Sequence, residues 1–469
     1  MSDAAPAPGS ALLAAILHPT EPCLLMRRET AGWSLPRVEL AERVWLPPSQ
    51  PIIQGMRDAV GVDAVVLRYV TVAVDDPAVE RLRRAIYVME AREPTNALRD
   101  ARWIDQPDLL DLPLAQPDQR ALLAECLREF GHGAVPALRP GWARRGWLAR
   151  AAAWIETELE RAGCEAVGPI EQLKAWGISC VLRVSTTSGD VYFKATPLPG
   201  DDPAWLPLLF ANEPTLTRAL AARFPAHVPT PLAIDRDQHW LLLRDFGTPL
   251  DYGAPIDDWE RVLAAFAAIQ VSSVPHVDGL LADGALDRRL DRLPAQLDAV
   301  HAEPDALAAL DPVDAEPFRA AAPRLRAICA ELANYGLPPT LMHGDLHLGN
   351  VVAREGSLLF FDWTDGCIGH PGFDLVTIWE GVDEAFPDAD AARERLRAAY
   401  LTPWMRHPPM ADLLEASRLT DVLGALHLTI SYAHIVANLE PEDRVEMTAG
   451  LAYFARATLR ALDRFDGRR

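Results

Sequence analysis

The feature that most restricts the fold is a dense polar segment among apolar residues, at positions 341–350. It reads Leu-Met-His-Gly-Asp-Leu-His-Leu-Gly-Asn, and a second aspartate, Asp362, follows twelve positions after Asn350. This strand-rich window, 341–362, interrupts a region that shows helical periodicity from about residue 256 onward. The pattern predicts a helical part of the chain with a β-hairpin inside it.

A second hairpin is predicted upstream of this helical part. Residues 180–185 and 191–195 alternate in polarity on either side of Thr-Ser-Gly-Asp at 187–190, which is typical of a tight turn. Before it, residues 142–162 have the periodicity of a helix that stops at Gly163. A β-rich part followed by a mainly helical part is therefore expected, which makes the fold class α+β.

A separate small unit is expected at the N-terminus. Apolar runs predict strands at 11–17, 23–26, 65–74 and 84–90, and helical patterns occur at 51–60 and 118–129. The Gly- and Pro-rich stretch that begins at Gly131 predicts a linker. The sequence therefore indicates a small α/β domain at 1–130 and a linker at 131–147.

Charge, hydropathy and cysteine spacing exclude several classes of function. Residues 1–150 hold 18 basic and 19 acidic side chains, whereas the rest of the chain holds 27 and 47, so most of the net charge of −21 lies there. Such a surface repels nucleic acid and anionic lipid, so we expect neither as a partner. No apolar run approaches the roughly 18 residues of a membrane span, and no membrane association is expected. The six cysteines occur singly, without zinc or disulfide spacing, which favours a reducing cytoplasm.

Asp345, Asn350 and Asp362 suit phosphoryl transfer. One carboxylate can orient and deprotonate a hydroxyl group, while an amide oxygen and a second carboxylate hold Mg²⁺ on the phosphates. Hard oxygen ligands without a nearby cysteine favour Mg²⁺ over zinc. A lone aspartate in a loop is more often a turn residue, but Asp345 and Asn350 share one dense polar segment and Asp362 follows it closely.

The two lysines of the chain are also informative. Of 45 basic residues, 43 are arginine, and only Lys174 and Lys194 are lysine. An ammonium group is a compact point charge that a guanidinium does not replace. Lys194 ends the predicted hairpin and is a candidate phosphate ligand, whereas Lys174 is interpreted as a surface residue.

The segment 343–350 followed by Phe361-Asp362-Trp363 is similar to the aminoglycoside phosphotransferase and choline kinase-like family. Further similarity lies in the hairpin that ends at Lys194, and in the segments His-Val-Pro-Thr-Pro at 227–231, Trp-Leu-Leu-Leu-Arg-Asp-Phe at 240–246 and Gly-Phe-Asp-Leu at 372–375. The resemblance covers roughly residues 165–400. It implies a two-lobed protein-kinase-like fold, with a β-rich N-lobe at 148–250 and a helical C-lobe at 251–469. It also implies ATP and Mg²⁺ as cofactors and a small-molecule hydroxyl acceptor as substrate.

The resemblance also assigns roles to individual residues. Asp345 matches the catalytic base, Asn350 and Asp362 match the Mg²⁺ ligands, and Lys194 matches the lysine on the nucleotide phosphates. Glu213 is expected to pair with the lysine, and Ser179 is expected in the phosphate turn. Leu243 and Asp245 are expected beside the adenine. His343 and Asp374 are expected to brace the catalytic loop. For Glu213 the alternative is a simple interaction with the N-terminus of its helix, because Pro214 marks a first helical turn.

Two departures from the kinase pattern refine the hypothesis. The phosphate turn at 175–179 has a single glycine in place of a glycine-rich loop. Only eleven residues separate Asp362 from Asp374, and no Ala-Pro-Glu follows, which favours a small molecule over a protein as the acceptor. The acidic character of this part of the chain favours a cationic acceptor. Three tryptophans close in sequence to acidic residues (Trp363, Trp379 and Trp404, near Asp365, Glu380 and Asp383) are either a wall for that cation or core residues.

Residues 11–129 are similar to a Nudix domain, through Arg27-Arg28, Gly-Trp-Ser-Leu-Pro at 32–36 and Arg-Trp-Ile at 102–104. When the Nudix box is aligned on Gly61, its glycine becomes Leu40 and its first glutamate Leu46. The core of the box becomes Gln54, Gly55, Met56, Arg57, Asp58 and Ala59, so one of four carboxylates remains. We therefore expect a degenerate, non-hydrolytic module; an unrelated α/β domain is the alternative.

Two functions of different classes remain from the sequence. The first is an ATP- and Mg²⁺-dependent phosphotransferase with a small, cationic hydroxyl acceptor. The second is a non-catalytic, pseudokinase-like module that binds a nucleotide or regulates a partner. The intact Asp345, Asn350, Asp362 and Lys194 favour the first. An active Nudix hydrolase would need carboxylates that the box lacks.

Overall fold

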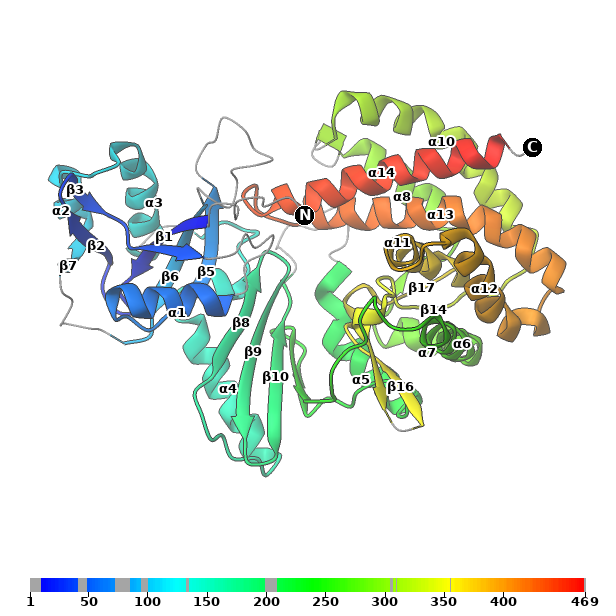
Figure 1. Cartoon of the computed structure of the whole chain (residues 1–469), viewed down its shortest axis with the longest axis horizontal. Helices are drawn as coiled ribbons and strands as arrows, with labels where there is room; N and C mark the ends of the chain where they lie inside the picture. Colours follow the sequence, from blue (N-terminus) through cyan, green and yellow to red (C-terminus); the bar gives the residue numbers. More distant parts are fainter. Residues whose placement is uncertain are drawn as a thin grey trace, which may run out of the picture. The chain divides into compact units, whose positions relative to one another are not determined.

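The structure is a computed structural model that describes residues 10–40, 49–71, 85–93, 100–131, 135–198, 209–303, 307–308, 310–354 and 356–467. The chain forms two compact units (Figure 1). The first comprises Met1–Pro197 together with Glu440–Asp443, and the second comprises Leu198–Leu439 with Arg444–Arg469. The expected domain boundaries at residues 130, 147 and 250 stay predictions.

The N-terminal part of the first unit is a seven-stranded sheet with helices on both faces. Its elements are β1 (Ser10–Leu17), β2 (Cys23–Glu29), β3 (Gly32–Ser34), β4 (Arg37–Leu40), α1 (Ser49–Val60), β5 (Ala64–Thr71), β6 (Ala85–Ala91), β7 (Ala101–Asp105), α2 (Gln106–Asp111) and α3 (Arg120–Gly131). The main path of the sheet is β3-β2-β1-β6-β5, with β1 and β6 parallel.

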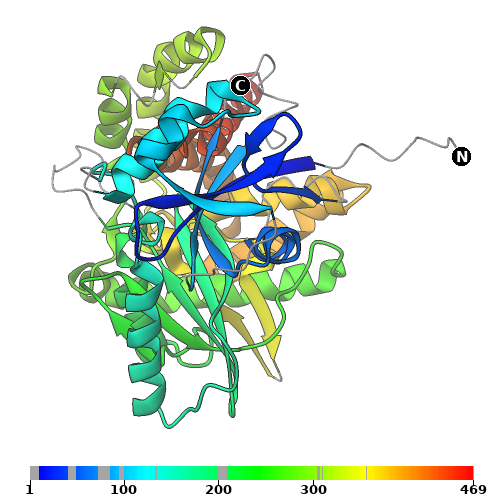
Figure 2. The same ribbon diagram turned by 90° about the vertical axis from the view of Figure 1, so that its left-hand side faces the viewer.

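The side chains of β1 point alternately to the two faces of the sheet, so that the sheet forms a layer between α1 on one side and α2 and α3 on the other. Leu12 and Ile16 pack in one buried cluster with residues of α1, whereas Ala15 and Leu17 pack in a second cluster with residues of α2 and α3. Successive side chains of a strand point to opposite faces of the sheet, so this apolar strand is buried on both sides. Figure 2 shows α1 and α3 on opposite faces of the sheet.

The first unit continues with a helix and a three-stranded meander: α4 (Trp147–Arg161), β8 (Glu171–Trp176), β9 (Ser179–Thr186) and β10 (Gly189–Ala195). The predicted hairpin at 180–195 is confirmed, since Thr186 pairs with Gly189 across a two-residue turn. The predicted helix starts at Trp147 instead of 142, because Gly146 has a left-handed φ of 70° that breaks the helical path. Its end before Gly163, with a φ of 67°, is confirmed.

Two contacts join this meander to the N-terminal sheet. The side-chain amide of Gln172 on β8 donates to the carbonyl oxygen of Val66 and accepts its backbone N–H, both at 2.8 Å. The register of β5 shifts immediately after Val66, which leaves those backbone groups for the amide to satisfy. In addition, both carboxylate oxygens of Glu90 on β6 accept the backbone N–H of Gly146 at 3.0 Å. Gly146 precedes α4 and has no side chain with which to cap it, so Glu90 supplies the cap.

The second unit is mainly helical. Its strands are β11 (Ala233–Asp235), β12 (Trp240–Arg244), β13 (Leu286–Asp287), β14 (Thr340–Met342), β15 (Val351–Arg354), β16 (Ser357–Phe360) and β17 (Cys367–Gly369). Its helices are α5 (Glu213–Arg223), α6 (Ile256–Ser273), α7 (Val277–Ala282), α8 (Leu293–Ala302), α10 (Pro312–Ala333), α11 (Leu375–Ala385), α12 (Ala389–Leu401), α13 (Met410–Ala437) and α14 (Arg444–Asp466). The predicted embedded hairpin is confirmed as β15 and β16.

One long apolar helix, α13, lies in the core of the second unit. Among the described residues, α13 alone is long and apolar enough to cross a membrane, and 89% of its apolar window is buried inside the protein. It packs along α14 and against α8 and α10 in one apolar cluster (Figure 1).

Several sequence expectations fall outside the described residues. They are the end of the strand expected at 65–74, the first residue of the strand expected at 84–90, the linker residues 132–134 and Leu46 of the Nudix-like box.

Candidate active site

A buried loop between β14 and β15 carries the expected base Asp345. Gly344 precedes it with a φ of 82°, a conformation that side-chain-bearing residues rarely adopt. A Cβ atom at this position would also lie 2.5 Å from the carbonyl oxygen of Asp365. Glycine is therefore required both by the turn and by the close approach of the loop at Asp365.

The carboxylate of Asp374 braces this loop, as the sequence predicts. It accepts the backbone N–H groups of His343 at 3.2 Å and of Gly344 at 2.8 Å. Burial raises the pKa of Asp374 to about 7, and the two backbone N–H groups oppose this shift. His343 is also fully buried, and its Nε2 lies 2.9 Å from the carbonyl oxygen of Phe361, which makes that nitrogen the N–H donor.

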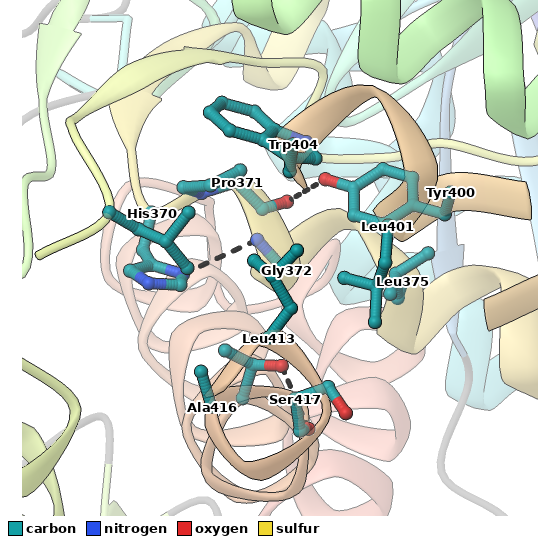
Figure 3. A pocket seen from close by; sticks show the side chains of 12 residues that line it. His370, Pro371, Gly372, Leu375, Tyr400, Leu401, Trp404, Leu413, Ala416 and Ser417 are labelled. Carbon is teal, nitrogen blue, oxygen red and sulfur yellow. Dashed lines mark hydrogen bonds between the residues drawn. The ribbon is translucent and has the colours of Figure 1, made fainter. Parts of the chain in front are cut away.

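A second layer of polar side chains holds Asp374. The amide of Gln270 on α6 donates to the Asp374 carboxylate at 2.9 Å and to the carbonyl oxygen of Leu341 at 3.1 Å. Tyr400 on α12 donates both to Gln270 and to the carbonyl oxygen of Pro371. Figure 3 shows this tyrosine in the lining of a small cavity with His370 and Trp404. None of the predicted site residues lines that cavity, which lies behind the loop.

Asp345 and Asn350 are held together by the loop. The Asn350 side chain donates to the backbone carbonyl oxygen of Asp345 at 2.9 Å and lies 3.4 Å from its Oδ2. The side chain of Asp345 is 49% exposed and so can reach a substrate. His347 Nε2 lies 3.6 Å from the same oxygen, and the hydrogen bond and charge of Asp345 outweigh the effect of burial to raise the pKa of His347.

Asp362 adopts an unusual backbone conformation, with φ of 62° and ψ of 59°. Its carboxylate accepts a hydrogen bond from the hydroxyl of Thr364, which also lies 3.3 Å from a carboxylate oxygen of Glu213. The backbone N–H of Phe361 donates to the carbonyl oxygen of Asn350 at 3.1 Å. The structure therefore brings Asn350 and Asp362, the two expected metal ligands, to one place and links Glu213 to them through Thr364.

The donor set fits a magnesium ion that also uses phosphate and water oxygens. The hydrogen bonds of Asn350 Nδ2 to Asp345 leave the amide oxygen of Asn350 for a metal, and Asp362 supplies a carboxylate. Among the described residues, no group of three or more His, Cys, Asp or Glu side chains forms a metal site. Mg²⁺ typically binds through one or two protein oxygens and keeps the rest of its shell for water and phosphate.

The expected adenine segment lies at the end of β12. Leu243 is half-buried, whereas Asp245 is exposed and its carboxylate accepts the backbone N–H of Gly247 at 2.9 Å. The ring of Phe246 lies 4.9 Å from that of Phe361, the residue before Asp362. Within the second unit, the segment after β12 therefore lies beside the expected metal site.

Lys194 and Ser179 belong to the first unit. Lys194 is half-buried on β10, opposite Val181 on β9. Ser179 is buried, and its hydroxyl accepts the indole N–H of Trp176 at 2.6 Å. Their contacts with a nucleotide stay predictions.

A half-buried carboxylate and two tyrosines occur near the expected base, and sequence reasoning missed the tyrosines. Burial raises the pKa of Glu380 on α11 to about 7, and the charge of Asp345 raises it further. Tyr453 on α14 donates a hydrogen bond that lowers this pKa. Burial also raises the pKa of Tyr432 on α13, with contributions from Asp345 and Glu380.

The three tryptophans proposed as a cation wall are core residues. Trp363 and Trp404 are at most 1% exposed, and Trp379 donates to Asp421 and lies under the guanidinium of Arg397. Asp383, expected near a cation, forms an ion pair with Arg393. Thr364 and Gln270 were missed because each contacts residues far away in sequence, although Gln270 is a polar residue in a mainly apolar helix.

A family model places the chain in a class of small-molecule kinases. The chain belongs to the phosphotransferase enzyme family (APH), whose model matches residues 177–412, slightly more than half of the chain. This confirms the resemblance to aminoglycoside phosphotransferases and choline kinases over that range and the α+β, protein-kinase-like fold class. No curated protein matches the whole-chain sequence significantly.

Solved structures of three enzymes are among those similar to this chain. They are macrolide 2′-phosphotransferase MphH from Brachybacterium faecium (18% identity, 64% of this chain and 98% of that chain, TM-score 0.42), choline kinase LicA from Streptococcus pneumoniae (14%, 66% and 99%, 0.47) and spectinomycin phosphotransferase in complex with ADP and spectinomycin (11%, 66% and 98%, 0.41). The low TM-scores and identities mean that none of them bears on the substrate of this protein.

Proposed function

We propose that this protein is an ATP- and Mg²⁺-dependent phosphotransferase that acts on a hydroxyl group of a small, cationic molecule. The observation that carries the proposal is the loop in which Asp345 and Asn350 share hydrogen bonds, followed by the β15–β16 hairpin that leads to Asp362. Support comes from membership of the phosphotransferase enzyme family.

The proposed roles follow from the positions of the oxygen atoms. Asp345, with an exposed carboxylate, orients the acceptor hydroxyl and takes its proton as the new O–P bond forms and the bond to the leaving phosphate oxygen breaks. Asn350 and Asp362 hold Mg²⁺, which neutralises charge on the phosphates when it is bound. Lys194 holds the nucleotide phosphates. Asp374 keeps the loop in place without contact with the reacting atoms.

The cationic acceptor is proposed from Glu380 and its neighbours. Burial, and to a smaller extent the charge of Asp345, raises the pKa of Glu380 and so disfavours its negative charge. A bound cation would favour that charge, and the rings of Tyr432 and Tyr453, which both contact Phe454, offer faces for it.

The N-terminal domain is proposed to be a degenerate Nudix-like module without hydrolase activity. On α1, the remaining box carboxylate of Asp58 accepts a hydrogen bond from Gln54 at 2.8 Å. Arg57 forms an ion pair with Asp63 at 2.7 Å, and Met56 is buried. Gly55 and Ala59, which have no carboxylate, stand at two positions where the box of an active enzyme carries a glutamate.

Turnover of a panel of acceptors with Mg-ATP tests the proposal, with amino alcohols and aminosugars beside their uncharged analogues. Wild-type protein should release ADP only with an acceptor, and Asp345→Asn should lose at least a hundredfold in kcat. Equal ADP release by both proteins would contradict the catalytic assignment. The alternative, a non-catalytic module, predicts no turnover by either protein, and absence of thermal stabilisation by Mg-ATP would exclude nucleotide binding as well.

A further inference from the structure

The turn between β8 and β9, in the first unit, is held by three side-chain contacts. Trp176 and Ser179 pair across this turn, and Gly177 and Ile178 form its tip. The family resemblance places the nucleotide phosphates here. Kinases commonly use several glycines in the corresponding loop, whereas this turn has one.

Three contacts hold Trp176. The indole N–H of Trp142 donates to the backbone carbonyl oxygen of Trp176 at 3.0 Å. The indole N–H of Trp176 itself donates to Ser179 at 2.6 Å, across the turn. Lys174 Nζ lies 3.6 Å from the centre of the Trp176 ring, which is a cation–π contact. Backbone, ring face and ring edge of this tryptophan are thus all engaged.

The tip of the turn packs closely against Asp443. A Cβ atom at Gly177 would lie 2.8 Å from the Cβ of Asp443, so no side chain fits there. Gly177 does not have a left-handed φ. The glycine therefore serves the close approach of Asp443, which lies in the short connection between α13 and α14.

The residues that hold the turn are themselves fixed to the N-terminal domain. Trp142 lies in the segment between α3 and α4, where Arg139 forms buried ion pairs with Glu129 on α3 and with Glu440 in the same α13–α14 connection. At the other end of this segment, Glu90 caps α4 through Gly146. The position of Trp142 is thus determined from both sides by residues of the N-terminal domain.

We propose that Trp142 and Lys174 are positioning residues for nucleotide binding, which hold the β8–β9 turn in the conformation that receives the phosphates. This inference rests on the proposed function. A turn that is ordered before the nucleotide arrives does not lose conformational entropy on binding, which increases affinity. The N-terminal domain then acts as a structural part of the nucleotide site, and Lys174 has a role that its place in the sequence did not suggest.

Trp142→Phe tests the inference because it removes one N–H donor and keeps an aromatic ring. The full-length variant should bind Mg²⁺ with a non-hydrolysable ATP analogue roughly fivefold more weakly by calorimetry, the effect of one lost hydrogen bond. Lys174→Met should act in the same direction, and Lys174→Arg, which keeps a cation over the ring, should restore affinity. Hydrogen exchange at the Gly177 and Ile178 amides should become faster in Trp142→Phe and Lys174→Met.

Trp33→Phe is the matched control, because Trp33 lies on β3 at the opposite edge of the N-terminal sheet from β5. It should leave both affinity and exchange unchanged. If wild-type protein binds the nucleotide analogue and Trp142→Phe and Lys174→Met bind it equally well, the positioning role is wrong and the proposed function stands. A wild-type protein that does not bind the analogue would overturn the proposed function and the positioning role together.

Discussion

The carboxylate of Asp374 accepts the backbone N–H of Gly344 at 2.8 Å, directly before the expected base Asp345. Because Gly344 has a positive φ, the chain turns sharply at this point, and the carboxylate holds the turn by its backbone. Gln270 and Tyr400 in turn hold Asp374 in place. The position of the base is therefore set by a chain of buried hydrogen bonds that reaches back to α6 and α12.

Replacement of Asp374 by asparagine should destabilise the loop. Asp374 accepts hydrogen bonds at both carboxylate oxygens, so the NH₂ group of asparagine would face an N–H donor at one of them. We expect Asp374→Asn to lower the free energy of unfolding by about 2 kcal/mol and kcat by roughly tenfold or more. Urea denaturation and initial rates measure the two effects. Asp412→Asn, at an exposed position of α13, is the control, and an equal loss there would contradict the bracing role.

Gly344→Ala should be more harmful than the same change at another left-handed glycine. Gly336 has a φ of 68° and open space around it, whereas an alanine Cβ at Gly344 would lie 2.5 Å from a carbonyl oxygen. Both variants carry the backbone strain of about 1 kcal/mol, and only Gly344→Ala adds the steric clash. Thermal denaturation should therefore show a clearly larger loss for Gly344→Ala. Equal losses would mean that the close approach at Asp365 relaxes without cost.

The proposed cationic acceptor predicts a dependence on pH. Since burial raises the pKa of Glu380 to about 7, this carboxyl group is mostly neutral at pH 6 and mostly ionised at pH 8. We expect kcat/KM for a cationic acceptor to rise as pH increases through about 7. In Glu380→Gln this rise should disappear and kcat/KM should fall by roughly tenfold, while KM for ATP stays the same.

An uncharged acceptor provides the comparison for this pH profile. For the uncharged acceptor, kcat/KM should not show the rise through pH 7 that Glu380→Gln removes for a cationic acceptor. If wild type and Glu380→Gln give the same profile with a cationic acceptor, Glu380 does not bind the cation.

Gln172 should be sensitive both to loss of its amide and to added charge. Gln172→Leu leaves the backbone N–H and C=O of Val66 without partners, at a cost of about 2–4 kcal/mol. Gln172→Glu places a buried carboxylate oxygen against the carbonyl oxygen of Val66, so burial should raise the pKa of the new group. A carboxyl group with a raised pKa destabilises the folded state as pH rises through that value, because the folded state retains a proton that the unfolded state has lost.

Gln172→Glu should therefore be more stable at pH 4.5 than at pH 7.5, relative to wild type at the same pH. Urea denaturation at the two values measures this difference. Gln238→Glu, at an exposed position between β11 and β12, should show no such gain on acidification. A Gln172→Glu protein with wild-type stability at pH 7.5 would show that the contact with Val66 does not hold the meander.

The local parts of the structure could be predicted from the sequence. The β9–β10 hairpin follows from its turn residues, and the loop at 343–350 follows from its own residues and their spacing to Asp362. The brace at Asp374 also follows from the family pattern. In each case the information lies within a short stretch of chain.

Contacts between distant segments could not be predicted in this way. The amide of Gln172 contacts a residue 106 positions away, and a single glutamine in a strand has no sequence pattern that points to a partner. The start of α4 was misplaced because the residues before Gly146 share the apolar spacing of a helix but form a 3₁₀ turn and a left-handed step. The tryptophans near acidic residues were open to two interpretations, and only their burial decides for the core.

The cap that Glu90 provides to α4 has a consequence for how this protein can be divided. A fragment that starts at Gly146 would begin with a helix whose Gly146 N–H has lost the carboxylate of Glu90, and its β8 strand would carry a Gln172 amide that has lost Val66. Such a fragment would leave two polar groups without their partners, and its expression alone should give poorly soluble material. The N-terminal domain therefore completes the hydrogen bonding of α4 and β8, and the two parts are not interchangeable modules.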